Sequence, residues 1–289
     1  MLSPVMDDII RRFPFQSLRF FIRLEEGGKL PEIKGAMWHG WLGHMLRGNS
    51  GLYQLLYGTH AVQQPKPYMI RTERNAQTHY QAGEIVFFDL FLLGAACQAA
   101  EYLVDHFVGT PCCPLGRQLI PAKVQSIATL TPMGLRSGIY PGRLADWIMV
   151  RPVEVWHEVA LHIESPLRLK FQGNVIKAGP VPLPFLLDQI IRRFSLLTSY
   201  WVDDNPELLA TLSRTIPVCD YQWSGTSVYF EDWQRFSVRQ NEKLPFGGLM
   251  GQICYQGDIG PIIPWLEVGQ HLQIGGKTTF GLGHYRLIS

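Results

Sequence analysis

Long apolar runs are absent from the sequence. The longest apolar segment, residues 85–100, is interrupted by Asp89, Gly94 and Gln98, and no run reaches the ~18 residues of a membrane-spanning helix. The first 15 residues mix acidic, basic and apolar side chains without the uninterrupted apolar stretch of a signal peptide. We therefore expect neither a membrane span nor a signal peptide.

Cysteine is scarce and irregularly spaced. The chain holds five cysteines, and the adjacent pair Cys112 and Cys113 lacks the two-residue gap that suits a pair of zinc ligands. An odd number without regular spacing argues against both a disulfide framework and a zinc site. We expect a cytoplasmic protein with reduced thiols, no metal site and no cofactor.

A strong charge of either sign is also lacking. The net charge of the 289 residues is +2, so any surface that attracts nucleic acid has to be local. Hydrophobic residues make up 46% and charged residues 17%, which is typical of a globular protein with apolar cores. The length suits two domains of roughly 100–150 residues each.

The first half of the chain shows an order of elements that has a known architecture. Alternation over residues 18–24 predicts a strand, and apolar residues at helical spacing predict a helix from Pro31 to Leu46. The elements expected next are strands at 68–71 and 85–93, a helix at 95–108 and a strand at 119–128. This order is the βαββαβ pattern of a ferredoxin-like domain.

The second half repeats this order after a linker near residues 131–146, which are rich in Gly, Pro and Ser. The elements expected there are a strand at 155–171, a helix at 183–200, paired strands at 228–240 and 247–255, a short helix at 261–268 and a last strand within 271–287. The sequence therefore predicts an α+β protein of two tandem ferredoxin-like (RRM-like) domains, 1–146 and 147–289.

The most distinctive local segment is residues 273–285, QIGGKTTFGLGHY. Its four glycines and three central residues are Gly275, Gly276, Gly281, Gly283, Lys277, Thr278 and Thr279. Glycine permits positive φ and close approach of a backbone to a ligand, and successive exposed N–H groups form an anion-binding nest. The spacing differs from that of a P-loop and of a dinucleotide fingerprint. We interpret the segment as a phosphate-binding loop; a glycine-rich hairpin that only packs tightly is the alternative.

The helix expected at 31–48 carries two histidines beside a face that is nearly bare of side chains. Its apolar residues gather around Trp38, and the opposite side holds small residues and Arg47. His39 and His44 flank that bare side, and Arg47 lies one turn from His44. A histidine beside a cation suits general acid–base chemistry at neutral pH. Two half-buried histidines at a domain interface are the alternative.

Two expected strands carry basic residues on one face. In residues 232–240, DWQRFSVRQ, alternation places Arg235 and Arg239 on the same side, at a spacing that roughly matches successive phosphates. Arg168 and Lys170 repeat the arrangement on another strand. Beside the glycine-rich segment, these strands predict a local RNA groove. A solvated strand face with screened charges is the alternative.

Several segments in series resemble the CRISPR repeat-processing endoribonucleases of the RAMP superfamily. Those in the first half are LPEIKGAMWHGWLGHMLRG (30–48), PYMIR (67–71) and VFFDLFLLG (86–94). Those in the second half are SPLRLKFQGN (165–174), RRFSLL (192–197), DWQRFSVRQ (232–240), PFGGLMGQICYQG (245–257) and GGKTTFGLGHYRL (275–287). The resemblance spans nearly the whole chain, and motifs in series are more specific than any one of them.

The resemblance implies metal-independent cleavage of CRISPR repeat RNA. A ribose 2′-OH would attack the adjacent phosphate and leave a 2′,3′-cyclic phosphate and a 5′-OH end. The resemblance also implies a catalytic histidine on or near the first helix, a role that we carry to His44 with His39 as its substitute. Arg47 would stabilise phosphate charge, and His60, after the helix, is a third candidate. His39 stands where the motif has Arg, so it is either an added catalytic group or a neutral replacement.

The glycine-rich segment, the basic strands and Lys34 together give the set of residues that we expect to bind RNA. The residues are Lys34, Arg168, Lys170, Arg235, Arg239, Gly275, Gly276, Lys277, Thr278, Thr279, Gly281 and Gly283. The expected partners are CRISPR repeat RNA and other CRISPR effector subunits, with the chain as a monomer or homodimer. Two further hypotheses stay open. The chain could be a non-catalytic RAMP subunit that grips guide RNA, or a scaffold whose sheets bind a protein.

Overall fold

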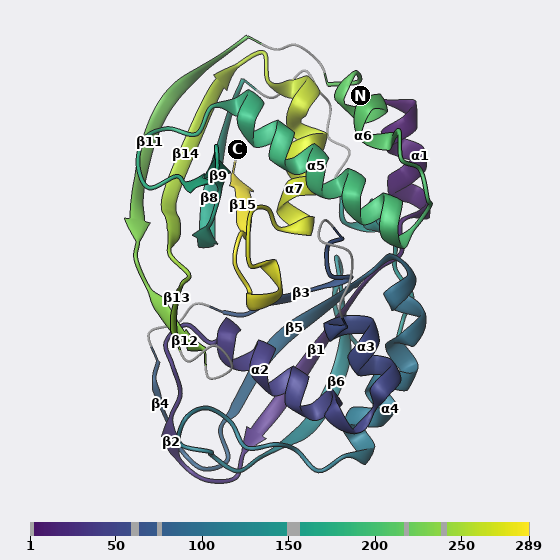
Figure 1. The fold of residues 1–289 in the computed structure, drawn as a ribbon, viewed down its shortest axis with the longest axis vertical. Helices are drawn as coiled ribbons and strands as arrows, with labels where there is room; N and C mark the ends of the chain where they lie inside the picture. Colours follow the sequence, from purple (N-terminus) through teal and green to yellow (C-terminus); the bar gives the residue numbers. More distant parts are fainter. Residues whose placement is uncertain are drawn as a thin grey trace.

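The computed structural model describes residues 3–58, 64–73, 77–148, 157–216, 220–237 and 242–288. Two antiparallel sheets occupy the two halves of the molecule, one below the other in Figure 1, and helices pack on each. The α+β class and the tandem ferredoxin-like architecture expected from the sequence are confirmed.

The first sheet has the strand order β3-β5-β1-β6-β7. Its strands are β1 (Phe15–Leu24), β3 (Tyr68–Arg71), β5 (Ile85–Leu93), β6 (Ala122–Thr131) and β7 (Gly134–Ser137). The helices are α2 (Gly35–Met45), η1 (Leu46–Gly48), α3 (Ser50–Tyr57), η2 (Gly94–Ala99), α4 (Ala100–Gly109) and η3 (Leu144–Trp147). A small ladder joins β2 (Gly28–Lys29) to β4 (His79–Tyr80). If the four main strands β1, β3, β5 and β6 are numbered 1 to 4 in chain order, their order in the sheet is 2-3-1-4. This is the order of a ferredoxin-like domain.

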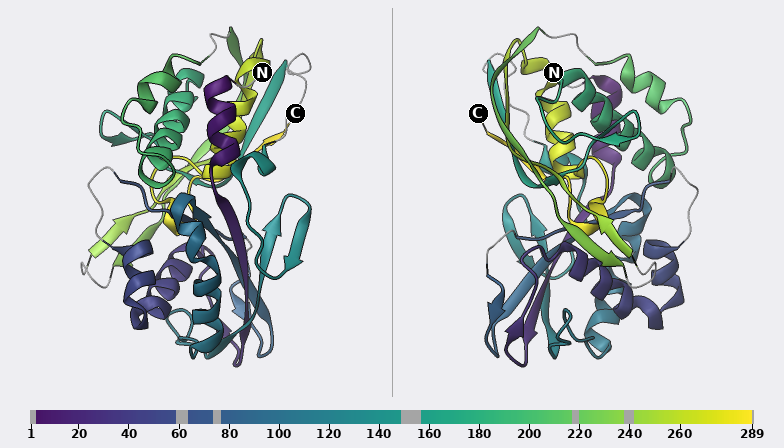
Figure 2. Two further views of the ribbon diagram at one scale, coloured as in Figure 1. Left: turned by 90° about the vertical axis from the view of Figure 1, so that its right-hand side faces the viewer. Right: turned by 60° about the vertical axis from the view of Figure 1, so that its left-hand side comes forward.

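Aromatic packing holds helix α2 on the first sheet. Phe20 of β1 stacks on Phe88 of β5 with ring centroids 4.9 Å apart, and Trp38 of α2 stacks on Phe88 at 4.7 Å. Trp41 meets Phe20 edge-on, and its indole N–H donates to the carbonyl of Cys113. These rings come from the even-numbered face of both strands, so α2 packs on that face (Figure 2, left).

The second sheet has the order β11-β14-β8-β15 and repeats the topology. Its elements are β8 (Glu158–Leu167), α5 (Leu183–Trp201), α6 (Leu208–Ser213), β11 (Tyr221–Glu231), β14 (Gly248–Gly257), η5 (Gly260–Ile262), α7 (Ile263–Leu272) and β15 (Tyr285–Ile288). Short ladders add β9 (Lys170–Phe171) with β10 (Asn174–Val175), and β12 (Gln234–Ser237) with β13 (Glu242–Pro245). The turn η6 (Thr278–Phe280) precedes β15.

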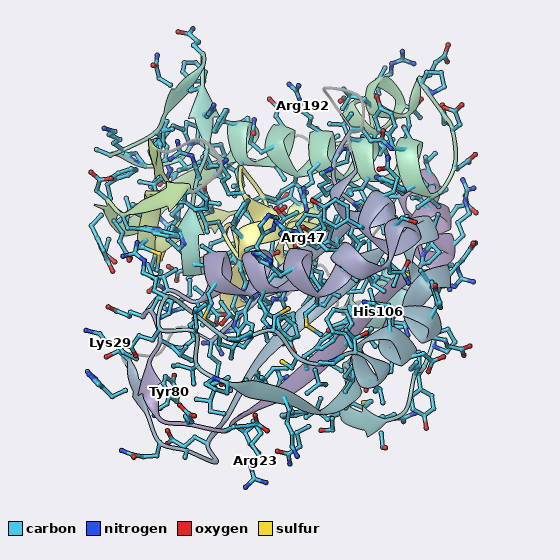
Figure 3. All side chains as sticks on the ribbon, turned by 60° about the horizontal axis from the view of Figure 1, so that its bottom comes forward. Arg23, Lys29, Arg47, Tyr80, His106 and Arg192 are labelled. Carbon is cyan, nitrogen blue, oxygen red and sulfur yellow. The ribbon has the colours of Figure 1, made fainter. Side chains whose placement is uncertain are left out.

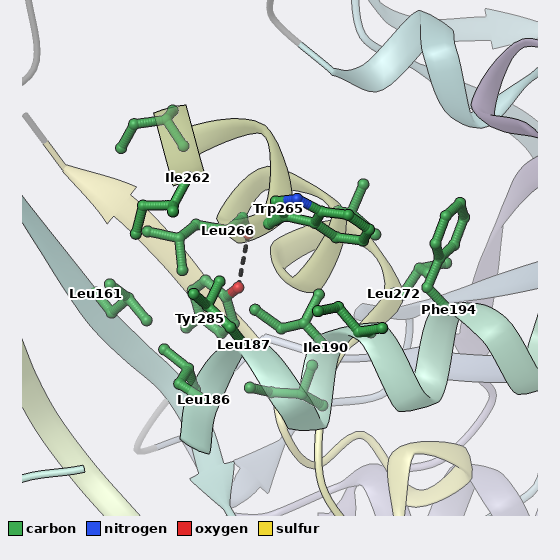
Figure 4. Close-up of a cluster of buried hydrophobic side chains, with 14 of the residues drawn as sticks. Leu161, Leu186, Leu187, Ile190, Phe194, Ile262, Trp265, Leu266, Leu272 and Tyr285 are labelled. Carbon is green, nitrogen blue, oxygen red and sulfur yellow. Dashed lines mark hydrogen bonds between the residues drawn. The ribbon is translucent and has the colours of Figure 1, made fainter. Parts of the chain in front are cut away.

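Helices α5 and α7 close the core of the second half. Leu186, Leu187, Ile190 and Phe194 of α5 are buried against Trp265 and its neighbours on α7 (Figure 4). The buried hydroxyl of Tyr285 donates a hydrogen bond to the carbonyl of Leu266, at 2.6 Å. This bond ties the last strand to α7.

The first helix, α1 (Pro4–Arg12), packs with the second half of the molecule (Figure 1). Ser3 caps it by accepting from the Met6 N–H, and Pro4 occupies its first turn. Its buried residues join the core of α5, and Arg12 pairs with Asp203 at 2.9 Å. The predicted domain boundary at 146/147 stays a prediction.

Several element boundaries differ from those that the sequence predicts. Helices α1 and α3 were not expected, and the helix expected at 31–46 begins only at Gly35. The strand expected at 228–240 is wrong, because β11 ends at Glu231 and β12 belongs to a separate hairpin. His271 and Leu272 continue helix α7 rather than starting the last strand, which begins at Tyr285.

Within the described ranges, no helix is both long and apolar enough to cross a membrane. The same ranges hold no group of three or more His, Cys, Asp or Glu side chains that could bind a metal ion.

Candidate active site

Helix α2 and the segment before the last strand meet directly. We call residues 273–284 the tail loop. A Cβ atom added to Gly35, the first residue of α2, would lie 2.0 Å from the carbonyl oxygen of Phe280. Only glycine allows this approach of two backbones. Parts of the chain more than 240 residues apart thus form one surface, with β3 beside them.

The glycines of the tail loop serve the loop's own packing. Gly275 and Gly283 have φ of 81° and 84°, and a Cβ on Gly283 would lie 1.9 Å from the carbonyl of Ile274. The N–H groups of Gly276, Gly281 and Gly283 donate to backbone carbonyls of Arg168, Thr278 and Pro166. These bonds reduce the number of N–H groups that the expected anion nest could offer, and the RNA-binding role of these glycines stays a prediction.

His39 is the predicted histidine that contacts the tail loop. Its Nδ1 lies 3.2 Å from the carbonyl oxygen of Thr279 and 3.1 Å from the hydroxyl of Tyr68. A carbonyl oxygen only accepts, so Nδ1 carries the proton when the bond to Thr279 forms, and Nε2 is then left as the basic nitrogen. The ring of Phe280 lies against the imidazole, with centroids 3.7 Å apart. The half-buried imidazole is therefore fixed in orientation.

Two tyrosines complete the surroundings of His39. The Tyr57 hydroxyl donates to the carbonyl of His39, and its ring packs against Gly43, where a Cβ would lie 3.1 Å away. Burial raises the pKa of Tyr57 well above its ordinary value and raises the pKa of Tyr68 as well. Both phenols therefore stay protonated at neutral pH and can donate hydrogen bonds. Gly43, which leaves the helix face bare, makes room for Tyr57.

Lys277 brings a positive charge to the same cluster. Its ammonium lies 5.3 Å from the ring centroid of Phe246 and 5.7 Å from that of Phe280. Phe246 meets Phe280 edge-on at 5.0 Å. The residue itself is exposed, so this charge is accessible from solvent next to the ring that packs on His39.

His44 and Arg47 lie further along α2 and η1 and are exposed. His44 comes five positions after His39, which turns its side chain about 140° around the helix axis, away from the tail loop. Arg47 lies beside α2 in Figure 3. His60 lies outside the described residues. The structure thus joins His39 to the tail loop and leaves His44 with Arg47 on the adjoining surface.

The predicted RNA-binding cations differ in burial and in hydrogen-bond partners. Lys34 is buried, with 4% of its surface exposed, and donates to the carbonyl of Gln77. Burial lowers the pKa of its ammonium. Lys34 also lines a small cleft beside Gly35 and Phe280, at the junction of the two halves.

Arg168 and Lys170 do not share one strand, which corrects the sequence expectation. β8 ends at Leu167, and the Arg168 guanidinium turns back to donate to the carbonyl of Gly247 at 2.8 Å. Lys170 is exposed on β9. The backbone of Arg235 lies on β12, and Arg239 lies outside the described residues, so their common face stays a prediction.

A cluster of polar side chains joins β8 to the end of the tail loop and to β15. Nδ1 of His284 donates to the Glu164 carboxylate at 3.0 Å, and Arg286 contacts the same carboxylate at 3.1 Å. Burial lowers the pKa of His284 to about 4, and the hydrogen bond from His284 lowers the pKa of Glu164. Arg71 of β3 reaches across to the carbonyl of Gln270. The His284 imidazole is therefore neutral at pH 7, because its pKa lies below that pH.

Three residues of this site were not singled out from the sequence: Tyr57, Tyr68 and Phe280. The sequence around the two tyrosines does not mark them as site residues, because isolated aromatic residues usually belong to the core. Their role depends on the pairing of β3 with its neighbours, which brings Tyr68 beneath α2.

The arrangement suits acid–base chemistry on an anionic substrate. It offers an oriented imidazole, two neutral phenols, an exposed ammonium and a second histidine with an arginine on the adjoining surface. The fold and the site together define a protein of the tandem ferredoxin-like class with a candidate proton-transfer site where the two halves meet.

Comparison with known families supports this class. Residues 161–285 match the family model described as CRISPR-associated endoribonuclease Cas6. Residues 13–148 match a second model, described only as an N-terminal domain. Residues 161–285 are therefore similar to the Cas6 family, and the resemblance to repeat-processing proteins of the RAMP superfamily is confirmed. No curated protein matches the sequence.

Solved structures share the fold of nearly the whole chain. A Cas6 product complex has a TM-score of 0.60 at 16% identity, over 95% of this chain and 100% of that one. Cas6 of Thermus thermophilus has a TM-score of 0.57 at 15% identity, over 96% and 99%. In a partial Cas6-RT-Cas1–Cas2 complex the TM-score is 0.63 at 16% identity, over 97% of this chain but only 47% of that one. The chain thus spans about half of that larger protein.

Proposed function

We propose that this chain is an endoribonuclease that cleaves CRISPR repeat RNA in precursor transcripts to give guide RNA. The observation that carries the proposal is the contact of His39 with the tail loop within a Cas6-type fold. The similar structures include Cas6 product complexes. RNA of the repeat is therefore the proposed substrate, and other CRISPR proteins are proposed partners.

The proposed reaction is a transesterification that needs no metal. A base removes the proton from a ribose 2′-OH, whose oxygen attacks the adjacent phosphorus. The bond to the 5′-oxygen then breaks, and an acid protonates that oxygen. The products are a 2′,3′-cyclic phosphate and a 5′-OH. Moving both protons with positioned side chains contributes typically about 10²–10⁴-fold to such a rate.

The roles fall to residues of α2, η1 and the tail loop. His44, which is exposed, is the proposed first acid–base group, and His39, whose Nε2 is left basic by its bond to Thr279, is the second candidate. Arg47 and Lys277 supply charge to the phosphorane that forms on the way. His60 is the third candidate for an acid–base role.

The test is the chemistry of the product ends in the absence of metal. Purified protein is incubated with repeat RNA in excess EDTA, and the fragments are analysed by mass spectrometry. We expect a cyclic phosphate on the upstream fragment and a 5′-hydroxyl on the downstream one. RNA that is bound but not cut would instead support the non-catalytic RNA-gripping subunit. A 3′-hydroxyl with a 5′-phosphate would overturn the proposed mechanism.

A further inference from the structure

The first sheet has one face that its helices leave open. Helices α2, α3 and α4 pack on the even-numbered face, and Figure 2 (left) shows them together on one side of β1. The opposite face carries the odd-numbered residues of β1 and β5 and their partners on β6. Near the junction of the halves, Trp147 packs on Phe15 and Phe91 and covers this face. Beyond that point, towards the Leu24 end of β1, the side chains become half-buried or exposed.

Aromatic rings lie in the uncovered part. Phe21 and Phe87 are cross-strand partners, and their ring centroids lie 6.2 Å apart at 46°. Both side chains are only half-buried, so parts of the two rings are accessible to solvent. The guanidinium of Arg19 stacks on Phe87, 4.3 Å from its centroid, and is held there by two hydrogen bonds to Asp89.

Cations surround these rings. Arg23 and Lys123 are exposed cross-strand partners one step beyond Phe21, and Arg23 points away from the protein in Figure 3. On this face of β1, β5 and β6, the register places Arg19, Arg23 and Lys123, against a single carboxylate, Asp89, which Arg19 neutralises. Glu73, next to β3, also acts on Arg19, so the exposed positive charge on these three strands comes from Arg23 and Lys123.

We propose that this open face, formed by Arg19, Phe21, Arg23, Phe87 and Lys123, binds single-stranded RNA. An aromatic ring and a guanidinium plane are stacking partners for unpaired bases, and the two exposed cations suit the phosphates between them. An uncharged, apolar protein face would not explain cations placed around the rings. The face is separate from the proposed cleavage site, because α2 and its histidines lie on the other side of the sheet.

Single-stranded RNA fits this open face better than a duplex does. Bases of a duplex are stacked on one another and offer no free ring face, whereas a single strand can spread its bases onto a sheet. This face would therefore hold an unpaired segment of the RNA, while the surface of α2 and the tail loop holds the scissile phosphate. The proposal goes beyond cleavage and assigns a second RNA contact to the chain.

The test uses the full chain and a fluorescein-labelled single-stranded RNA octamer of mixed sequence, followed by fluorescence anisotropy. Replacing both rings, Phe21→Leu with Phe87→Leu, keeps apolar side chains but removes the stacking faces. We expect the octamer to bind about 10-fold more weakly or worse, since stacking contributes ~1–3 kcal/mol per base. The matched control is Tyr229→Ala, because Tyr229 is a 57% exposed aromatic residue on β11 of the other sheet.

A second variant tests the charges. Arg23→Gln with Lys123→Gln should lower the dependence of log K on log salt by about 1.4, because each phosphate that is no longer neutralised on a single strand removes ~0.7 from the slope. The proposal is overturned if the wild-type chain does not bind the octamer, which would leave the face to a protein partner. It is equally overturned if the leucine variant binds as well as wild type, or if Tyr229→Ala weakens binding as much.

The outcome is independent of the proposed cleavage. Repeat-RNA cleavage by the wild-type chain is measured in the same buffer. If cleavage is absent while octamer binding depends on Phe21 and Phe87, only the endoribonuclease proposal fails. If cleavage occurs while the leucine variant binds the octamer normally, only the open-face proposal fails.

Discussion

The contact between Gly35 and the tail loop predicts opposite effects for two alanine substitutions in the same helix. In Gly35→Ala, the new Cβ would lie 2.0 Å from the Phe280 carbonyl oxygen, so the loop has to retreat by about 1.4 Å to reach ordinary contact. Gly40 has no atom within 4 Å of an added Cβ. Gly40→Ala therefore meets no obstacle and gains helix propensity.

The expected magnitudes follow from these distances. Overpacking costs typically ~1–3 kcal/mol, so Gly35→Ala should lower the free energy of unfolding by that amount. Gly40→Ala should raise it by ~0.5–1 kcal/mol. At ~2–4 °C per kcal/mol for a chain of this size, the two melting temperatures should move in opposite directions by measurable amounts.

Cleavage should respond to Gly35→Ala more strongly than stability does. A displacement near 1 Å at a positioned catalytic group can cost about 10²-fold in rate, and the loop that moves carries the carbonyl that orients His39. The assays are thermal unfolding and single-turnover cleavage of repeat RNA. If Gly35→Ala is as stable and as active as wild type, α2 does not contact the loop in the functional protein, and the site as described is wrong.

Two further predictions concern pH and salt. Burial lowers the pKa of His271 to about 3, below its ordinary 6.5, so the unfolded chain binds a proton more readily and stability falls as pH drops from 6.5 towards 3. In urea unfolding, His271→Phe should shrink the stability difference between pH 7 and pH 5 by about 2 kcal/mol; an undiminished difference would show that His271 is not responsible. Lys170→Ala, Arg235→Ala and Arg239→Ala should each weaken RNA binding and lower the salt dependence by ~0.7, and affinities and slopes equal to wild type would exclude these residues from the groove.

Much of the fold could be predicted because its elements carry strong local patterns. The apolar run of β5 gave its bounds, 85–93, and the order of elements gave both ferredoxin-like halves. Helix α1 was missed although Ser3, Pro4 and the Asp7–Arg11 pair are helix signals. Helix α7 runs through His271 and Leu272, because both are buried on the face that continues from Trp265 and Val268.

The site could be predicted only in part. The helix with two histidines and the glycine-rich segment were both identified, but no local pattern says that His39, rather than His44, contacts the carbonyl of Thr279. That contact joins residues 240 positions apart and depends on how the two halves pack. Likewise, Gly43 has no visible purpose in the sequence until Tyr57 of α3 is placed against it.

The central claim is that the surface where α2 meets the tail loop, together with the adjoining surface that carries His44, cleaves RNA. The most direct measurement is the single-turnover rate constant for repeat-RNA cleavage by the chain carrying both His39→Ala and His44→Ala, with RNA affinity determined in parallel. We predict a rate at least ~10²-fold below wild type with affinity retained. A rate equal to wild type would place the chemistry elsewhere and contradict the account.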